Sequence, residues 1–281
     1  MKKSVALFLT LVFVISVIII IGSVFALYEK FSDNTFYKKI SQNSVIIRDI
    51  NKSLFKLSDK INEKNIKYIF TSFLISSNDG NFRALITIIP LTNRVNINEV
   101  YKNRYAKKYL QNILEYYQVL DPIFLENLIL DTIDLDKNER LGGSEIVLKN
   151  PFFKQGKIYN YTHLKQILDY YFNITKDKKI YKIPWRKLFV FGYDSSIIDC
   201  NLISKDSAKF LGLHFNSALS CKSLNEYEEN KKIMQNLNII SYNKNVSYPI
   251  LINVKYDTEE LNITYDLNQK RIKDIKSNIL Y

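Results

Sequence analysis

The segment DTIDLDKNERLGGSE, residues 131–145, carries five acidic side chains and one asparagine. Its first three residues are the last three of PIFLENLILDTI, residues 122–133, whose apolar residues have helical spacing, and it contains two adjacent glycines, Gly142 and Gly143. Carboxylates crowded in this way repel one another unless a cation or solvent compensates their charge. The pattern therefore leaves two interpretations, a site for a hard divalent cation or a solvated acidic turn.

An EF-hand calcium loop places oxygen ligands at alternate positions and a bidentate carboxylate at its last position. Counted from Asp134, the matching groups are Asp134, Asp136, Asn138, the backbone carbonyl of Arg140, and Glu145. Glu139 stands where the EF-hand requires glycine, and Pro151 interrupts the segment that would be the exiting helix. A metal bound here would be a structural Ca²⁺ held by these five residues, outside an EF-hand pair, because no His or Cys is nearby to favour zinc. The pattern alone leaves the solvated acidic turn open as the alternative.

Residues 5–27, VALFLTLVFVISVIIIIGSVFAL, are uncharged and mostly apolar. As a helix they are long enough to cross a hydrocarbon layer of about 30 Å. Lys2 and Lys3 precede the segment, so the positive-inside bias predicts a single-pass helix with its N-terminus in the cytoplasm and the remaining chain outside. The alternative is a secretory signal removed after Ala26.

Cys200 and Cys221 are the two cysteines of the chain, which permits one disulfide in an oxidising compartment. The net charge is +12, but the basic residues are spread along the chain without a long basic block, so the sequence does not predict a polyanion site. His163 and His214 have no Cys or carboxylate at ligand spacing, and no nucleophile elbow, phosphate loop or zinc-protease helix is present. We therefore predict that the protein is not an enzyme.

The apolar pattern changes twice along the exported part of the chain. A helical pattern without Gly or Pro continues to about residue 65, and two strand-like runs, 66–75 and 82–91, flank the turn signal Asp79-Gly80. Helical patterns then extend from 95 to about 227, beginning with residues 98–120. Their predicted N-caps are Asp121 (before Pro122), Thr162 and Ser204.

Strand patterns return after residue 236 in LNIISY, YPILINVKY and ELNITYDL. Strands therefore flank a helical block. This order predicts an α+β fold with a long N-terminal transmembrane helix, an antiparallel sheet and a large all-α domain inserted between strands.

Several of these stretches together resemble the general secretion pathway protein K family, the large minor pseudopilins of type II secretion systems. KKS-VALFLTL resembles the family's leader and start of its apolar helix, and NRVNIN (93–98) resembles a segment like GRFNLN. DTIDLDKNERLGGSE aligns without a gap on a pattern like DWIDxDxxxRxxGAE. YTHLKQIL and IDCNLISKDSAKFLGL are weaker matches. The chain departs from the pattern at Ser4, Thr132 and Ser144, where the family has Gly, Trp and Ala.

The resemblance implies a pilin-like sheet and a leader cut between Ser4 and Val5 by a prepilin peptidase. Leu9 then stands where most pilin-like subunits carry Glu, as in the K subunit. The implied division of the chain is a leader (1–4), a transmembrane helix (5–27), the pseudopilin helix and first hairpin (28–95), an inserted α-helical domain (96–227), and C-terminal strands that complete the sheet (228–281).

The function implied is that of a minor pseudopilin at the tip of a type II secretion pseudopilus, anchored in the inner membrane with its C-terminal domain in the periplasm. Its partners would be the minor pseudopilins I and J, the major pseudopilin and the secreted protein cargo. An alternative is the tip subunit of a pseudopilus for DNA uptake in natural transformation, with weak DNA contact through the tip or its lysines. A third interpretation keeps the metal loop in a membrane-anchored periplasmic binding protein unrelated to filaments.

Overall fold

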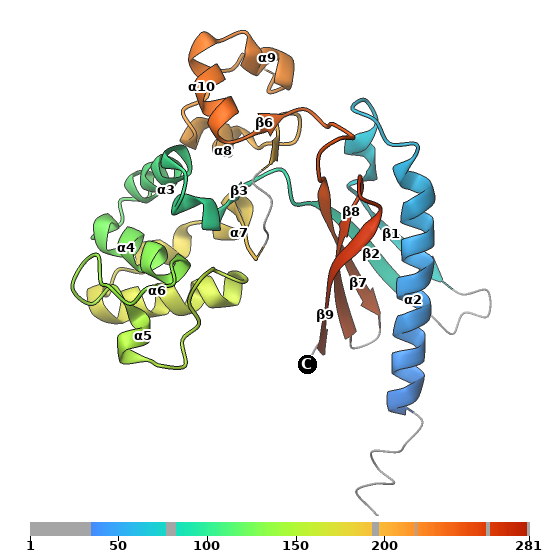
Figure 1. Ribbon diagram of the computed structural model, residues 1–281, viewed down its shortest axis with the longest axis horizontal. Helices are drawn as coiled ribbons and strands as arrows, with labels where there is room; N and C mark the ends of the chain where they lie inside the picture. Colours follow the sequence, from blue (N-terminus) through green and yellow to red (C-terminus); the bar gives the residue numbers. More distant parts are fainter. Residues whose placement is uncertain (1–34, 77–82, 193–196, 217, 257–258, 280–281) are drawn as a thin grey trace, which may run out of the picture. The chain divides into compact units, whose positions relative to one another are not determined.

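The computed structural model describes residues 35–76, 83–192, 197–216, 218–256 and 259–279 (Figure 1). The chain divides into two compact units, residues 1–56 and 57–281. The predicted leader, the membrane span, Leu9 and the Asp79-Gly80 turn lie outside the described residues. Among the residues that are described, no helix is both long and apolar enough to cross a membrane.

The first described helix is α2, Thr35–Ser58. It was predicted to continue to about residue 65, but it ends at Ser58, and the 3-10 helix η1, Ile66–Ile69, occupies the start of the predicted first strand. The asparagines between them explain the difference. The side chain of Asn62 accepts from the backbone N–H of Asn65, and that of Asn65 accepts from the N–H of Asn62, at 3.2 and 2.7 Å. Such local bonds compete with helix continuation.

The five-stranded sheet is antiparallel throughout, in the order β1-β2-β7-β8-β9. Its strands are β1 (Ser72–Ser76), β2 (Arg83–Pro90), β7 (Pro249–Tyr256), β8 (Glu259–Asp266) and β9 (Arg271–Ile279). Alternation places Ile86 and Ile88 of β2 on the same face as Val254 and Ile252 of β7, and all four are buried. The predicted strand 66–75 thus overlaps β1 only in its second half, and the predicted strand 82–91 contains β2, which pairs directly with β1.

The sequence pattern missed β9. Its residues 271–276, RIKDIK, alternate charge with isoleucine, and the row of basic residues lowers their strand signal. β9 is an edge strand, and charged side chains on an edge discourage pairing with another chain.

The helical insertion leaves the sheet after β2 and returns at β7, which is the neighbour of β2 in the sheet. The N–H of Leu91 donates to the carbonyl of Pro249 at 3.3 Å, so the two ends of the insertion lie beside each other. The prediction of a helical block inserted between strands of one antiparallel sheet is confirmed.

The insertion has one apolar core, whose largest fully buried side chains include Trp185, Tyr109, Tyr171 and Phe189. Figure 1 shows α4, α5 and α6 side by side, and contacts join α4 to both α5 and α6. The helices are α3 (Arg104–Tyr116), α4 (Pro122–Ile133), α5 (Ile146–Lys149), α6 (Tyr161–Thr175), α7 (Trp185–Leu188), α8 (Lys205–Phe210), α9 (Cys221–Asn225) and α10 (Glu228–Asn236), with 3-10 helices η2 (Ile97–Val100) and η3 (Lys178–Lys182).

Three details of the predicted insertion are corrected. It is not purely helical, because β3 (Val95–Asn96) pairs with β4 (Phe189–Val190), and β5 (Ile198–Asp199) pairs with β6 (Ile239–Ile240). LNIISY therefore supplies β6 and does not join the five-stranded sheet. The insertion also continues past residue 227, since α10 occupies the start of the segment that was assigned to C-terminal strands.

Two of the three predicted N-caps are confirmed. Asp121 accepts from the N–H of Phe124, with Pro122 at the first helical position, and Ser204 accepts from the N–H of Ser207. The third prediction, Thr162, is wrong, because Asn160 caps α6 through the N–H of His163. Asparagine is as good a cap as threonine or better, and here it stands two residues earlier.

Asp266, at the end of β8, fixes the turn into β9. It is fully buried, and its carboxylate accepts hydrogen bonds from Ser247 and from the backbone N–H groups of Tyr248, Asn268 and Gln269, and pairs with Lys273 at 3.0 Å. Burial alone would raise the pKa of Asp266, but these bonds outweigh it and the pKa is lowered.

We expect Asp266→Asn to lower the free energy of unfolding by about 1–3 kcal/mol at neutral pH, since a charge-assisted set of bonds is lost. The folded-state pKa lies below the ordinary value of about 3.9, so the contribution of the carboxylate is complete above that value and disappears as the pH falls through the folded-state pKa. Urea denaturation at a series of pH values measures it.

The control is Asp274→Asn in β9, whose side chain is 51% exposed and pairs with Lys276. It should change stability by less than about 1 kcal/mol. Equal losses in the two variants, or a loss for Asp266→Asn that grows in acid, would contradict this account of the turn.

Candidate metal centre

The acidic loop begins in the last turn of α4, which delivers Asp131 to the protein interior. Asp131 is fully buried, and its carboxylate accepts hydrogen bonds from the Ser144 hydroxyl and from both the side chain and the backbone N–H of Arg140. Ser144 in turn accepts from the N–H of Leu141 at 3.0 Å. These bonds fold residues 140–144 back onto the end of α4.

Asp134 and Glu145 are also buried, with 6% and 1% of their surface exposed. Asp134 forms an ion pair with Arg140, yet neither of its carboxylate oxygens receives a hydrogen bond of good geometry. Glu145 accepts from Gln155 through Oε1, while its Oε2 has no partner among the described residues. Buried carboxylate oxygens without donors are costly, so they mark a place where a cation would be stabilised.

The electrostatics of the loop agree with its geometry. Burial, followed by the charges of Asp131, Asp134 and Asp136, raises the pKa of Glu145 to about 7. Burial also raises the pKa of Asp134, against the opposing effect of Arg140. Both shifts have the same main cause, the desolvation of a carboxylate, and neighbouring negative charges add to each.

The structure brings together only part of the predicted ligand set. Asp134 and Glu145 are buried, whereas Asp136, Asn138 and the Arg140 backbone lie on the exposed stretch 135–140. Asp136 accepts from the N–H of Asn138 at 2.8 Å. Within the described chain, no three acidic side chains of this loop place one oxygen each within 4.8 Å of one another. The donors suit a hard cation chemically, but they do not converge on one point.

Arg140 was predicted to offer its carbonyl, yet its side chain has the larger role. The guanidinium pairs with both Asp131 and Asp134 and lies over the ring of Tyr101 at 5.4 Å. Sequence reasoning missed this internal counter-ion. The signal was available in the sequence, since Arg140 is the one arginine in a loop with five carboxylates.

A second feature missed from the sequence is the pocket beside the loop, about 670 Å³ in volume. Asp134 and Asp136 line it together with Asn96, Asn98 and Glu99, which follow or belong to the NRVNIN segment. Asn98 is held in place because it donates to the carbonyl of Ile158 and accepts from its N–H, at 3.2 and 2.8 Å. Two stretches that resemble the same family therefore face one pocket.

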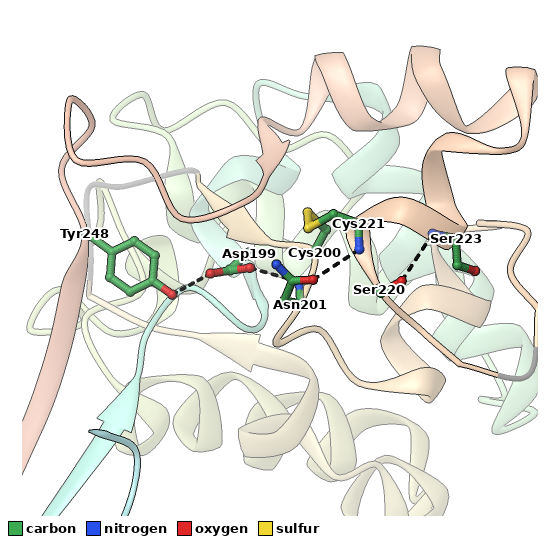
Figure 2. Close-up of a disulfide and its surroundings, with 7 residues drawn as sticks. All are labelled: Asp199, Cys200, Asn201, Ser220, Cys221, Ser223 and Tyr248. Atoms are coloured by element: carbon green, nitrogen blue, oxygen red, sulfur yellow. Dashed lines mark hydrogen bonds between the residues drawn. A yellow bond between two sulfur atoms is a disulfide. The ribbon is translucent and has the colours of Figure 1, made fainter. Parts of the chain in front are cut away.

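Cys200 and Cys221 are joined by a disulfide with a Cα–Cα distance of 4.9 Å (Figure 2). An oxygen of Asp199 and the two sulfurs lie within 4.8 Å of one another. The sulfurs are bonded to each other and are not thiolates, so this group cannot act as a metal site while the bridge is intact.

The two histidines have structural surroundings. The ring of His163 packs against Phe153 and Tyr159, its Nδ1 accepts from the N–H of Tyr159, and burial lowers its pKa. The backbone N–H of His214 donates to the side-chain oxygen of Asn230, and the backbone carbonyl of His214 accepts from the side-chain amide of the same residue.

The fold is an antiparallel sheet with a helical domain inserted between two neighbouring strands, and this arrangement defines a structural class. A solved structure of this class is the crystal structure of the GspK-GspI-GspJ complex from the enterotoxigenic Escherichia coli type 2 secretion system, with a TM-score of 0.61. The match covers 87% of this chain and 99% of that chain, at 12% identity, and it shows the fold. The sequence matches no protein-family profile, and it matches no curated protein.

We expect Arg140→Ala, measured in the presence of EDTA, to lower the free energy of unfolding by about 3–5 kcal/mol, because it leaves buried Asp131 without its counter-ion. Arg140→Lys should recover only part of the loss, because lysine restores the positive charge but its ammonium is more strongly hydrated than a guanidinium and is costlier to hold beside buried carboxylates. Arg104→Ala is the control, because that guanidinium lies on an exposed surface over Tyr105. Similar losses in the two alanine variants would refute the counter-ion role.

Proposed function

We propose that this chain is a K-type minor pseudopilin at the tip of a type II secretion pseudopilus, where it initiates assembly and acts in protein export across the outer membrane. The observation that carries the proposal is the fold. A sheet interrupted between β2 and β7 by a helical insertion is similar over 87% of the chain to a structure from a complex named for GspK, GspI and GspJ. The DTIDLDKNERLGGSE segment adds support. Asp131, Asp134 and Arg140 stand at positions of the family pattern, and the arginine forms ion pairs with both buried aspartates.

The proposed partners follow from the same similarity. The neighbouring structure is a complex of GspK with GspI and GspJ, so we infer that this chain assembles with I-like and J-like minor pseudopilins and, below them, with the major pseudopilin. The size of the insertion would block another subunit from stacking above. We place the chain in the inner membrane as a single-pass protein with residues after the span in the periplasm.

The N-terminal residues supply the proposed route into the filament. Prepilin peptidase would cut between Ser4 and Val5, leaving Leu9 where other pilin-like subunits carry Glu. A carboxylate within a membrane helix is costly unless it meets a partner. A subunit without it needs no neighbour above, which is consistent with a place at the tip.

A second candidate function is the tip of a pseudopilus for DNA uptake in natural transformation. One observation favours it, the concentration of exposed basic side chains between residues 176 and 187. The fold is compatible with either role.

Deletion of the gene and complementation with the intact chain should separate these roles. Under the main proposal, the deletion strain fails to release secreted proteins while its transformation frequency stays unchanged, and complementation restores secretion. Loss of transformation with normal secretion would indicate that the protein acts in DNA uptake and not in protein export. Normal values for both, together with failure to co-purify any pilin-like subunit, would exclude a pseudopilus role.

We also propose that the acidic loop binds Ca²⁺, through Asp134, Asp136, Asn138, the Arg140 carbonyl and Glu145. The buried Glu145 Oε2, which receives no hydrogen bond from the residues that the structure describes, and the Asp134 carboxylate, which is ion-paired with Arg140, fit a hard cation, and the loop's net negative charge attracts one. Bound calcium would join the end of α4 to the start of α5. Loop residues 135–140 are exposed, so their backbone can adjust without breaking the core.

Chelation of calcium with EDTA should lower the melting temperature, because an ion at a hundredfold excess over its Kd stabilises the folded state by about 2.7 kcal/mol. Asp134→Asn and Glu145→Gln should abolish this calcium-dependent shift. Glu139→Gln is the matched control, since Glu139 is exposed in the same loop and its side chain accepts from the N–H of Gly143. Identical melting curves with calcium and with EDTA would show that the loop is only an acidic turn.

A further inference from the structure

The segment KDKKIYKIPWRK, residues 176–187, has six basic residues and one acidic residue. It therefore contributes a net charge of +5 to a chain whose total is +12, within twelve of its 281 residues. Read as a sequence, these cations are separated by isoleucines, a proline and a tryptophan, and they do not form an unbroken basic block. The structure shows how they are arranged.

The fold separates the two kinds of side chain. Ile180, Ile183 and Trp185 are buried, and the Trp185 indole N–H donates to the carbonyl of Ile180 at 2.9 Å, which pins η3 and α7 to the core. All six basic residues are exposed. We call them the basic strip: Lys176, Lys178, Lys179, Lys182, Arg186 and Lys187.

The acidic residue of the segment does not neutralise the strip. Asp177 points inward, where its carboxylate accepts from the backbone N–H groups of Leu120 and Lys179 at 2.8 and 2.9 Å. In the described part of the chain, no carboxylate forms an ion pair with a member of the strip. Asp169 lies next to the strip, where its carboxylate accepts from the Tyr181 hydroxyl at 2.6 Å.

Aromatic rings of α6 and η3 support the cations. The guanidinium of Arg186 lies 4.4 Å from the ring centroid of Tyr161, and the ammonium of Lys176 lies 5.8 Å from that of Phe172. Phe172 and Tyr181 pack edge to face at 5.7 Å. Cation–π contacts of this kind hold long basic side chains in preferred positions, so less conformational entropy is lost when an anion binds.

We propose that the basic strip binds the phosphate backbone of DNA without sequence preference. Six exposed cations within twelve residues, on a segment anchored by buried apolar side chains, suit a repeating phosphate chain, and five of the six are lysines, which bind phosphate as point charges. An anionic membrane is a poorer fit, because membrane-surface helices insert large apolar side chains, whereas Ile180, Ile183 and Trp185 of this segment are buried in the core. The proposal does not depend on the chain's place in a filament.

The test is fluorescence anisotropy of a labelled 20-base-pair duplex of random sequence, titrated with the purified full chain in detergent over a range of salt concentrations. Affinity should fall linearly on a log–log plot as salt rises. The triple variant Lys178→Ala/Lys182→Ala/Lys187→Ala should bind at least about tenfold more weakly, with a salt slope smaller by about 3, one for each phosphate contact removed.

The matched control removes the same charge elsewhere, with Lys205→Ala/Lys222→Ala/Lys232→Ala in α8, α9 and α10, where all three lysines are exposed. Circular dichroism melting confirms that both triple variants are folded. The proposal holds if only the strip variant loses affinity and salt slope. It fails if both triples weaken binding equally, which would indicate general attraction by the net charge, or if phosphatidylglycerol vesicles compete with the duplex more strongly than unlabelled duplex does.

Discussion

Buried Asp199 connects the helical insertion, through its backbone and its carboxylate, to the segments that join it to β2 and β7. Its backbone N–H donates to the carbonyl of Thr92, just after β2, and its carboxylate accepts from the hydroxyl of Tyr248, just before β7, at 2.6 and 2.7 Å. Figure 2 shows Tyr248 pointing toward Asp199, which is adjacent to the Cys200–Cys221 bridge. Burial raises the pKa of both Asp199 and Tyr248. One residue thus contacts the chain where the insertion leaves the sheet and where it returns, and it is adjacent in sequence to the disulfide.

The chain handles charge in two opposite ways. Around α4 and α5 it buries carboxylates against a single arginine, an arrangement that is satisfied only in part within the protein. Along η3 and α7 it buries the apolar residues and exposes the cations. Internal charge without full compensation favours binding of a small ion that can be dehydrated, while exposed charge of one sign favours a large polyanion that remains hydrated. The protein's two candidate binding features therefore differ in the class of ligand they suit.

Hydrophobic periodicity was sufficient to predict the α+β class, the helical insertion and the caps at Asp121 and Ser204, because these depend on local sequence. Periodicity failed to predict the elements whose formation depends on tertiary contacts. The two-residue strands β3, β4, β5 and β6 are too short for any periodic signal. α10 carries mostly polar residues, EENKKIMQN, and packs through few of them.

The candidate site shows the same limit. Residue types and spacing identified Asp134 and Glu145 as acids suited to a cation, since the sequence alone shows that both are carboxylates at positions typical of calcium ligands. Spacing could not reveal that the Arg140 side chain turns inward, or that Asn96 and Glu99 line the same pocket, because both depend on how distant segments meet. The basic strip was overlooked for a related reason. The separation of its exposed cations from Ile180, Ile183 and Trp185 is evident only once these three residues are known to be buried.

The adjacency of β2 and β7 has a consequence for the order of folding. The two strands pair directly although residues 91–248 separate them, so their contact order is high. Closing so long a loop in an unfolded chain is entropically unfavourable and slow. A folded insertion holds Thr92 and Tyr248 on either side of Asp199 and shortens the effective loop to a few residues. Folding of the insertion would then precede the pairing of β2 with β7, whereas β1–β2 and β7–β8–β9 join strands that are consecutive in the chain and do not depend on it.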